Sequence, residues 1–135
     1  MSARFAHQHH QLVRTAQAVL GAAEQKDQDA AARLTRLRLA LSREVSEHCG
    51  SELELINARR GATSPAQAAL IRRYHDDLLK WRHDLIRCNS DWPPRRVLTD
   101  PEGFRRDFGP VVDRLRERVR WEEEQFYPTV LARAA

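Results

Sequence analysis

The stretch LTRLRLALSREVSEHCGSELELI, residues 34–56, predicts a long amphipathic helix. Its apolar residues recur at steps of three and four, which is the spacing of one face of a helix. The same face carries a polar pair, His48 and Glu52, whose side chains project from adjacent turns. We expect the helix to cover residues 29 to 60 and to end before Gly61. Its inward residues would be Leu34, Leu37, Leu41, Val45, His48, Glu52, Leu55 and Ile56.

Three more segments have the same periodicity, at about residues 3–24, 65–89 and 110–133. The helix at 65–89 has a capping-box signature, because Ser64 precedes it and Gln67 follows three residues later. Its inward residues would be Leu70, Ile71, His75, Leu78, Leu79 and Leu85. Four helices with short links predict an all-α, up-down-up-down antiparallel four-helix bundle, which forms a single domain over residues 1–135.

Two proline-containing segments separate the last helices. The stretch Trp92-Pro93-Pro94 ends the third helix, and we expect a loop from there to Thr99. A helix restarts at Asp100-Pro101, and Gly109-Pro110 is expected to kink or break it. The final helix would point Val111, Leu115, Arg118, Glu122 and Phe126 to one side.

Charge and composition limit the class of protein. The 135 residues carry a net charge of +4, but the arginines are scattered along the chain, so we do not expect a nucleic-acid partner. No apolar run reaches the roughly 20 residues of a membrane span. The N-terminus has no secretory pattern, so we expect a cytoplasmic protein without a membrane partner. Phosphate-binding loops and nucleophile elbows are absent from the sequence, so we do not expect an enzyme.

Every predicted helix carries a polar residue on its apolar face. Burying an imidazole or a carboxylate is costly unless the group is paired, hydrogen-bonded or bound to a metal. A satisfied core histidine is the ordinary explanation for any one of these residues alone. Together they suggest a metal site, because imidazole and carboxylate ligands suit iron, manganese or zinc. The candidate metal ligands are His9, His48, Glu52, His75 and Glu122.

These candidates follow an order that is typical of a known family. His9 lies on the first helix, His48-x-x-x-Glu52 on the second and His75 on the third, and Glu122-Glu123 precedes Phe126-Tyr127-Pro128 on the fourth. The arrangement resembles the hemerythrin-like (HHE cation-binding) domain family over nearly the whole chain. The resemblance implies a four-helix bundle with a di-iron centre bridged by carboxylates, used for oxygen binding, redox sensing or iron handling.

Arg118 departs from that family pattern, which has a histidine at this position. An arginine stays protonated and is not a usable metal ligand. One hypothesis is therefore a metal-binding protein with an incomplete iron site, either mononuclear or di-iron. The other is a metal-free bundle in which Arg118 takes the place of the metal and pairs with Glu52 and Glu122. Such a bundle would act as a structural or interaction module with an unknown protein partner.

Three points stay open at the level of sequence. His10 could replace His9 as a ligand, because it also has an apolar residue three positions later. His83 could replace His75 if the third helix is rotated. Trp121 could face a neighbouring helix or a second copy of the chain, so a homodimer is one of the arrangements to consider.

Overall fold

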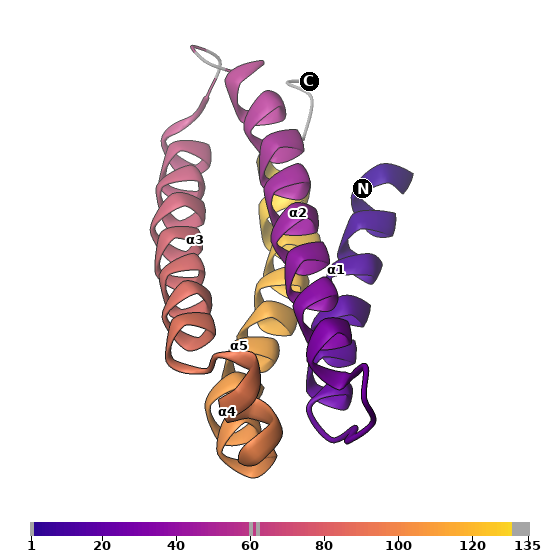
Figure 1. Cartoon of the computed structure of the whole chain (residues 1–135). Coiled ribbons are helices and arrows are strands. Elements are labelled where there is room, and N and C mark those ends of the chain that lie inside the picture. The colour runs from indigo at the N-terminus through magenta and orange to yellow at the C-terminus, as the bar shows by residue number, and fades with distance from the viewer. Residues whose placement is uncertain (1, 60, 62, 131–135) are drawn as a thin grey trace.

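The long helices lie side by side, roughly along a common axis (Figure 1). The computed structural model describes residues 2–59, 61 and 63–130. The helices in this part of the chain are α1 (Ala3–Ala22), α2 (Ala30–Asn57), α3 (Pro65–Asp91), α4 (Pro94–Thr99) and α5 (Pro101–Trp121). The short α4 lies at the turn between α3 and α5, and consecutive long helices run in opposite directions. The prediction of an all-α protein with antiparallel helices is confirmed.

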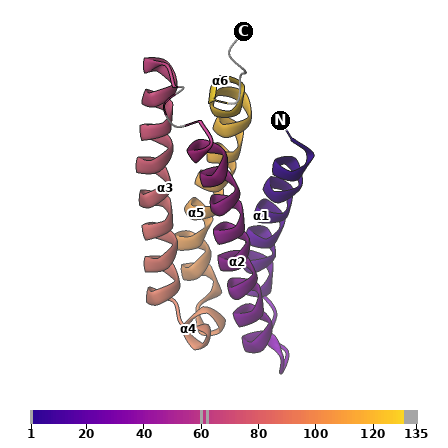
Figure 2. The same cartoon turned by 90° about the horizontal axis from the view of Figure 1, so that it is seen from above.

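Helix α5 lies between α3 and α1, as both views of the ribbon show (Figures 1 and 2). It packs against both of these helices, and α1 packs in turn against α2. The chain continues from α5 without interruption into a π-helical turn, η1 (Glu122–Phe126), and a last helical turn, α6 (Tyr127–Val130). Residues 122–130 therefore continue helix α5 along the bundle.

Side-chain caps fix where three of the helices begin, α1 being capped by the Ser2 hydroxyl, which accepts from the Phe5 N–H at 3.2 Å. The Ser64 hydroxyl accepts a hydrogen bond from the Gln67 backbone N–H at 3.1 Å, and the Gln67 side chain accepts one from the Ser64 N–H at 2.7 Å. The predicted capping box is therefore confirmed. The carboxylate of Asp100 accepts from the Gly103 N–H at 3.0 Å, so the first turn of α5 has a cap of its own.

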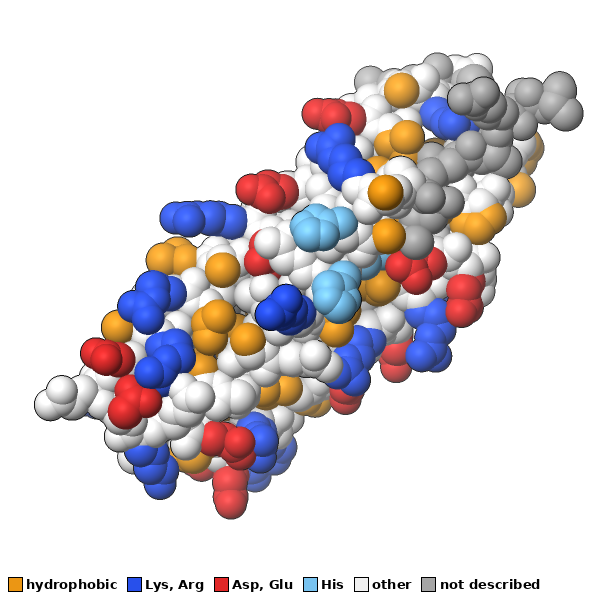
Figure 3. Space-filling model, turned by 90° about the vertical axis from the view of Figure 1, so that its right-hand side faces the viewer, with side chains coloured by type: hydrophobic (Ala, Val, Ile, Leu, Met, Phe, Trp, Pro, Cys, Tyr) orange, Lys and Arg blue, Asp and Glu red, His pale blue; other side chains and the backbone are white. Residues whose placement is uncertain are grey.

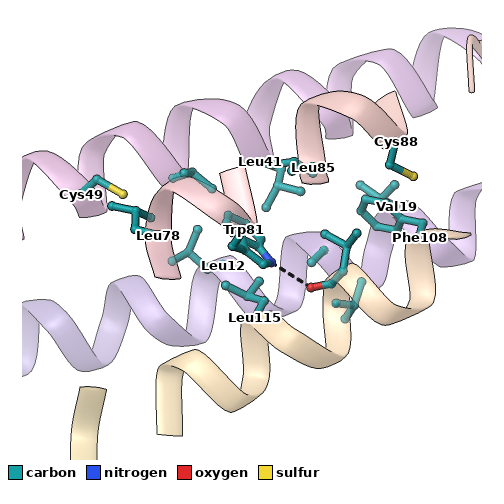
Figure 4. Packing of buried hydrophobic residues seen from close by; sticks show 14 of the residues in the cluster. Leu12, Val19, Leu41, Cys49, Leu78, Trp81, Leu85, Cys88, Phe108 and Leu115 are labelled. Atoms are coloured by element: carbon teal, nitrogen blue, oxygen red, sulfur yellow. Dashed lines mark hydrogen bonds between the residues drawn. The ribbon is translucent and has the colours of Figure 1, made fainter. Parts of the chain in front are cut away.

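The hydrophobic core fills the space between α1, α2, α3 and α5, and Figure 4 shows its central part. The Trp81 indole N–H donates to the backbone carbonyl of Val111 at 3.0 Å, which joins α3 to α5 and satisfies the ring's polar atom. The prediction that Leu78 and Leu79 are both buried is wrong, because Leu79 is 68% exposed. Consecutive residues of a helix point in different directions, and here Leu78 faces the core.

Of the local predictions around proline, the loop to Thr99 is wrong and the break at Gly109-Pro110 does not occur, while a kink there stays a prediction. Residues 94–99 form α4 instead of a loop, with Pro94 in the first turn, where its missing N–H has no cost, and Val97 fully buried. Gly109-Pro110 does not break α5, which is continuous from residue 101 to residue 121. Pro110 lies on the exposed side of the helix, where losing one backbone hydrogen bond leaves the packing intact. The last residues of the predicted 110–133 helix, from 131 on, lie outside the described residues.

The surface carries charged side chains of both signs (Figure 3), and the two thiols are buried. Cationic and anionic side chains are interspersed over the face that Figure 3 shows. Among the described residues, no helix combines the length and the hydropathy that crossing a membrane requires. Cys49 and Cys88 are both free, and burial raises the pKa of each thiol to about 11.

Candidate metal centre

Four of the five predicted ligands meet in the interior of the bundle. His9 comes from α1, His48 and Glu52 come from α2, and Glu122 comes from the start of η1. Each of the four residues is at most 4% exposed. One ligand atom from each residue can be chosen so that all four atoms lie within 4.8 Å of one another. Residues that are far apart in the sequence thus form one buried group with the donor atoms of a metal site.

The distances within the group match those between neighbouring ligands of a single ion. The two imidazole Nε2 atoms, of His9 and His48, are 3.1 Å apart. Glu52 Oε1 lies 3.1 Å from His48 Nε2, and Glu122 Oε1 lies 3.3 Å from each of the two Nε2 atoms. Ligands that are about 2.1 Å from an ion and subtend 90–110° at it are about 3.0–3.4 Å apart. The group therefore has the dimensions of one metal-binding shell.

A chain of hydrogen bonds orients the ring of His48. The Ser51 hydroxyl donates to the backbone carbonyl of Glu47 at 2.9 Å, so its oxygen is free to accept from the Gln8 amide N–H at 3.2 Å. This contact turns the amide oxygen of Gln8 toward His48, where it lies 2.7 Å from Nδ1. Because an amide oxygen only accepts, Nδ1 of His48 must carry a proton. The Nε2 atom is then the one that faces the centre.

A carboxylate orients the second ring in the same way. Oε1 of Glu123 lies 3.0 Å from Nδ1 of His9, which therefore donates its proton outward. Partners of this kind on the second ring nitrogen are typical of metal-binding histidines. With both Nδ1–H groups engaged, each Nε2 offers the centre a lone pair, or a second proton if the ring is charged. Two Nε2 atoms 3.1 Å apart beside two carboxylates require a cation among them, which is a proton or a metal ion.

Two buried tyrosines hold the carboxylate of Glu52. The Tyr74 hydroxyl donates to Oε1 at 3.0 Å, and the Tyr127 hydroxyl donates to Oε2 at 2.8 Å. The oxygen of Tyr127 also lies 3.0 Å from His9 Nε2. Burial and the nearby carboxylates, Glu52 among them, raise the pKa of both phenols well above the usual range. Both tyrosines therefore stay protonated and act as donors.

The backbone widens into the π-helical turn η1 where the chain continues from α5 to the candidate centre. The N–H of Tyr127 bonds to the carbonyl of Glu122, five residues earlier instead of four. In a wider turn, residues that are adjacent in sequence point in more similar directions. As a result Glu122 and Glu123 both reach His9, at 3.3 and 3.0 Å, and Phe126 and Tyr127 are both buried. Turns of this kind are frequent at functional sites.

Burial and mutual contact shift the ionisation of three ligands. Burial acts against a charged His48, but its hydrogen bonds to Glu122 and Glu52 prevail and raise its pKa to about 9. Burial also acts against a charged Glu122, yet hydrogen bonds from His48 and His9 hold its pKa below the usual range. Burial raises the pKa of Glu52. In the absence of a metal, a proton on His48 is the cation that balances the group.

One carboxylate oxygen of Glu122 lacks a hydrogen-bond partner among the described protein atoms. This oxygen, Oε2, is buried. A buried carboxylate oxygen without a partner is uncommon, because its desolvation is not compensated. A metal ion bound by Glu122 would compensate it, so the residues present fit a metal.

Several histidines that the sequence offers as ligands lie elsewhere. His75 is half-buried and its ring contacts Tyr74, whose hydroxyl reaches the centre instead. His10 and His83 are exposed, so the preference for His9 over His10 agrees with the structure. The structure thus places four of the five predicted ligands together and leaves His75 outside their group.

Arg118 does not form the expected pairs with Glu52 and Glu122. Among the described residues, neither carboxylate has an ion pair with it within 4 Å. Its guanidinium lies over the ring of Tyr74, 4.8 Å from the centroid, and Nη2 donates to the Tyr74 backbone carbonyl at 3.2 Å. The pairing does not form because the ring and the backbone carbonyl of Tyr74 hold the guanidinium instead.

The residues that hydrogen-bond to the candidate ligands and to their partners were not identified from the sequence. Only some of these residues lie in a sequence pattern that could have indicated their role. Ser51 lies three residues after His48, which is helical spacing, and Tyr127 belongs to the aromatic-proline ending. Nothing local marks Gln8 or Tyr74, because their partners come from other helices.

Comparison with family models, curated proteins and solved structures finds no match for this chain. The candidate centre therefore rests on the residues and their geometry.

Proposed function

We propose that this protein binds one transition-metal ion through His9 Nε2, His48 Nε2, Glu52 and Glu122. The observation that carries the proposal is the orientation of the two imidazoles. Both donate Nδ1–H outward, to Gln8 and Glu123, so both Nε2 atoms converge on the carboxylates. Since the four residues are buried and their ligand atoms lie at the separations of a single shell, a metal ion would satisfy all four donors at once.

A single ion fits the donor set better than a pair of ions. The group has two imidazoles and two carboxylates, while His75 lies outside it and Arg118 occupies the remaining family position. A second ion would need ligands that this part of the bundle does not bring to the centre. Imidazole nitrogen with carboxylate oxygen suits Fe(II), Mn(II) or Zn(II). Iron is our first candidate because of the hemerythrin-like order of the ligands.

The biological role that we propose is sensing or holding iron, oxygen or redox state, by a hemerythrin-like bundle with a reduced centre. This role rests on the order of His9, His48-x-x-x-Glu52 and Glu122-Glu123 along the helices. A binding role, rather than catalysis, is proposed because the ligands are enclosed and at most 4% exposed.

A metal-free interaction module is the second candidate. It is favoured by one observation, which is that contact with Glu122 and Glu52 raises the pKa of buried His48 to about 9. A proton on His48 could then replace a metal as the permanent internal cation. In this version the cation is the imidazolium and not Arg118, which contacts Tyr74.

Metal binding by the purified chain separates the two candidates. The chelator-treated protein is titrated with Fe(II) without oxygen, and separately with Mn(II) and Zn(II), followed by calorimetry and elemental analysis. We expect one ion per chain for wild type and for His10→Gln, which changes an exposed neighbour of the site. His48→Gln should lose this binding while keeping helical content. Absence of stoichiometric binding by wild type, or equal binding by the two variants, would support the metal-free module.

A further inference from the structure

A groove of about 250 Å³ lies between α3 and α5, close to the metal centre. Trp81 and Arg118 line the groove, and the same two residues line a smaller cavity of about 20 Å³. The candidate ligands His48, Glu52 and Glu122 also line that cavity. The side chains of Trp81 and Arg118 therefore separate the groove from the centre, and a molecule in the groove would lie next to the ligands.

The groove has an excess of positive charge that its own side chains do not neutralise. Arg73 pairs with Asp77 at 3.4 Å, and Arg114 pairs with Asp84 at 3.3 Å, so the two aspartates are each matched by a neighbour. The remaining charged side chains of the lining are Lys80, Arg118 and Glu117. These leave a net positive charge of one on the described lining, which favours an anion.

Two residues of the lining have buried donors without acceptors. Nη1 of Arg118 and Nε1 of Trp121 are buried and have no hydrogen-bond partner among the described protein atoms. The other terminal nitrogen of Arg118 donates to the Tyr74 carbonyl, so the guanidinium is held in place with one edge unused. Trp121 is only 8% exposed, and its Nε1 atom is itself buried. Buried donors of this kind normally have a partner, which indicates a ligand that accepts hydrogen bonds.

The shape of the groove restricts the ligand to a small molecule. Its volume lies below the roughly 300–1,000 Å³ of pockets for larger organic ligands. Trp81 provides an apolar wall, and its own N–H is already bonded to Val111. Arg73 lies over the ring of Trp121, 4.8 Å from the centroid, so the indole edge is what Trp121 offers to a ligand. A small acceptor group with an apolar body suits this lining.

We propose that the groove binds a small organic carboxylate, with its carboxyl group on Arg118 and Trp121 and its apolar part against Trp81. A guanidinium binds a carboxylate through charge-assisted hydrogen bonds, which are stronger than neutral ones. Binding needs small movements of both side chains, since their free donors are buried. The site lies outside the metal ligands, so its existence does not depend on the proposed metal.

The position of Arg118 couples this site to the centre if a metal is bound, and this step rests on the proposed function. Arg118 and three ligands border the same small cavity, so its positive charge opposes that of an ion. A carboxylate on Arg118 neutralises that charge. It should raise the affinity for the metal, and by reciprocity the metal should raise the affinity for the carboxylate by the same factor.

Benzoate is the probe for the first test, and the full chain without metal is titrated by calorimetry and by NMR of the tryptophan indole protons. Benzamide, a neutral molecule of the same shape, is the matched ligand control. We expect benzoate to bind and to shift the Trp121 indole signal, and benzamide to bind at least about tenfold more weakly. If the two ligands bind alike, if neither binds, or if inorganic phosphate binds more tightly than benzoate, the carboxylate site is wrong.

Two arginine variants of α5 locate the site. Arg118→Gln should weaken benzoate binding by about tenfold or more, because it removes the charged donor. Arg116→Gln makes the same change at an exposed position outside the groove and should leave binding unchanged. Equal losses in both variants, or no loss in Arg118→Gln, would overturn the assignment. The comparison of benzoate with benzamide on wild type decides the matter even if Arg118→Gln does not fold.

The coupling is tested separately with the metal-loaded protein. We expect benzoate to bind more tightly with the metal than without it, and the metal to bind more tightly with benzoate by the same factor. Equal affinities would overturn the coupling. A chain that binds benzoate but no metal would refute the proposed function and leave the groove site standing, so the two failures can be told apart.

Discussion

Metal binding is expected to release about one proton per ion at pH 7, because metal-free His48 holds a proton that the metal must displace. Burial lowers the pKa of His48, but its hydrogen bonds to Glu122 and Glu52 raise the pKa to about 9. Two pH units below its pKa, a group is about 99% protonated. A histidine ligand must be neutral at the nitrogen that binds, so the Nε2 proton leaves when the ion enters.

The size of the effect follows from the same pKa. At pH 7 the competition from the proton weakens the apparent metal affinity by about 100-fold, or about 2.7 kcal/mol. The apparent affinity should rise by about tenfold per pH unit up to a pH near 9, and then level off. The hydrogen bond from Nδ1 of His48 to the amide oxygen of Gln8 is not affected, because Nδ1 keeps its own proton.

Calorimetry in two buffers with different heats of ionisation counts the released protons. We expect about one proton per ion at pH 7 and almost none at pH 9.5, with the same result for His10→Gln, whose ring is exposed. Stoichiometric binding without proton release at pH 7 would refute the reasoning, because it would mean that His48 is neutral in the metal-free bundle.

Three further predictions concern the residues around the ligands. In the metal-free protein the pKa of His48 is about 9 when folded, compared with 6.5 for an unperturbed histidine, so its contribution to stability is complete below pH 6.5 and is lost as the pH rises through 9. Urea unfolding should show a decrease of up to about 3 kcal/mol over this window, and a flat profile would contradict the shift. Glu123→Ala should weaken metal binding by about 10–100-fold when the metal is titrated by calorimetry. Glu124→Ala, which changes an exposed neighbour, should leave metal binding unchanged. Tyr127→Phe should lower the free energy of unfolding by about 1–3 kcal/mol, since Glu52 Oε2 loses a buried donor; unchanged urea unfolding would show that this contact contributes little.

The sequence predicted the burial of those candidate ligands that periodicity alone can place. His48 and Glu52 are four residues apart on a long apolar stripe, so they had to lie on one face and inside the bundle. His9 shares the stripe of Leu12 and Ala16, and all three are buried. Where a polar residue continues an unambiguous apolar stripe, its burial follows from the helix geometry.

The third helix shows where this argument stops. Tyr74 and His75 are neighbours near the edge of the apolar face of α3, and a rotation of the helix by part of a turn decides which of them enters the core. The structure buries Tyr74 completely and leaves His75 half-buried. Packing against the other helices sets that rotation, and the sequence of α3 does not contain it. The same applies to Gln8 and Ser51, whose roles depend on the register of α1 against α2.

The π-helical turn could not be predicted from the sequence either. Residues 122–126 have no proline or glycine that would mark an irregular turn. The turn exists because it buries Phe126 and Tyr127 together while Glu122 and Glu123 both contact His9. These gains come from partners on α1 and α3, so the local sequence favours an ordinary α-helix and the tertiary contacts override it.

Arg118 on α5 lies near the candidate centre without pairing with its carboxylates. If Arg118 had paired with Glu52 and Glu122, the carboxylates would have had a permanent cation and the lone pairs of the histidines would have had no ion to bind. Instead Tyr74 holds the guanidinium through its ring and its carbonyl, and the same residue donates its hydroxyl to Glu52. A single tyrosine thus keeps the arginine away from the ligands and takes one of the hydrogen bonds that the arginine could have made. The four donors remain available to one ion, and the positive charge of Arg118 is directed to the groove beside them.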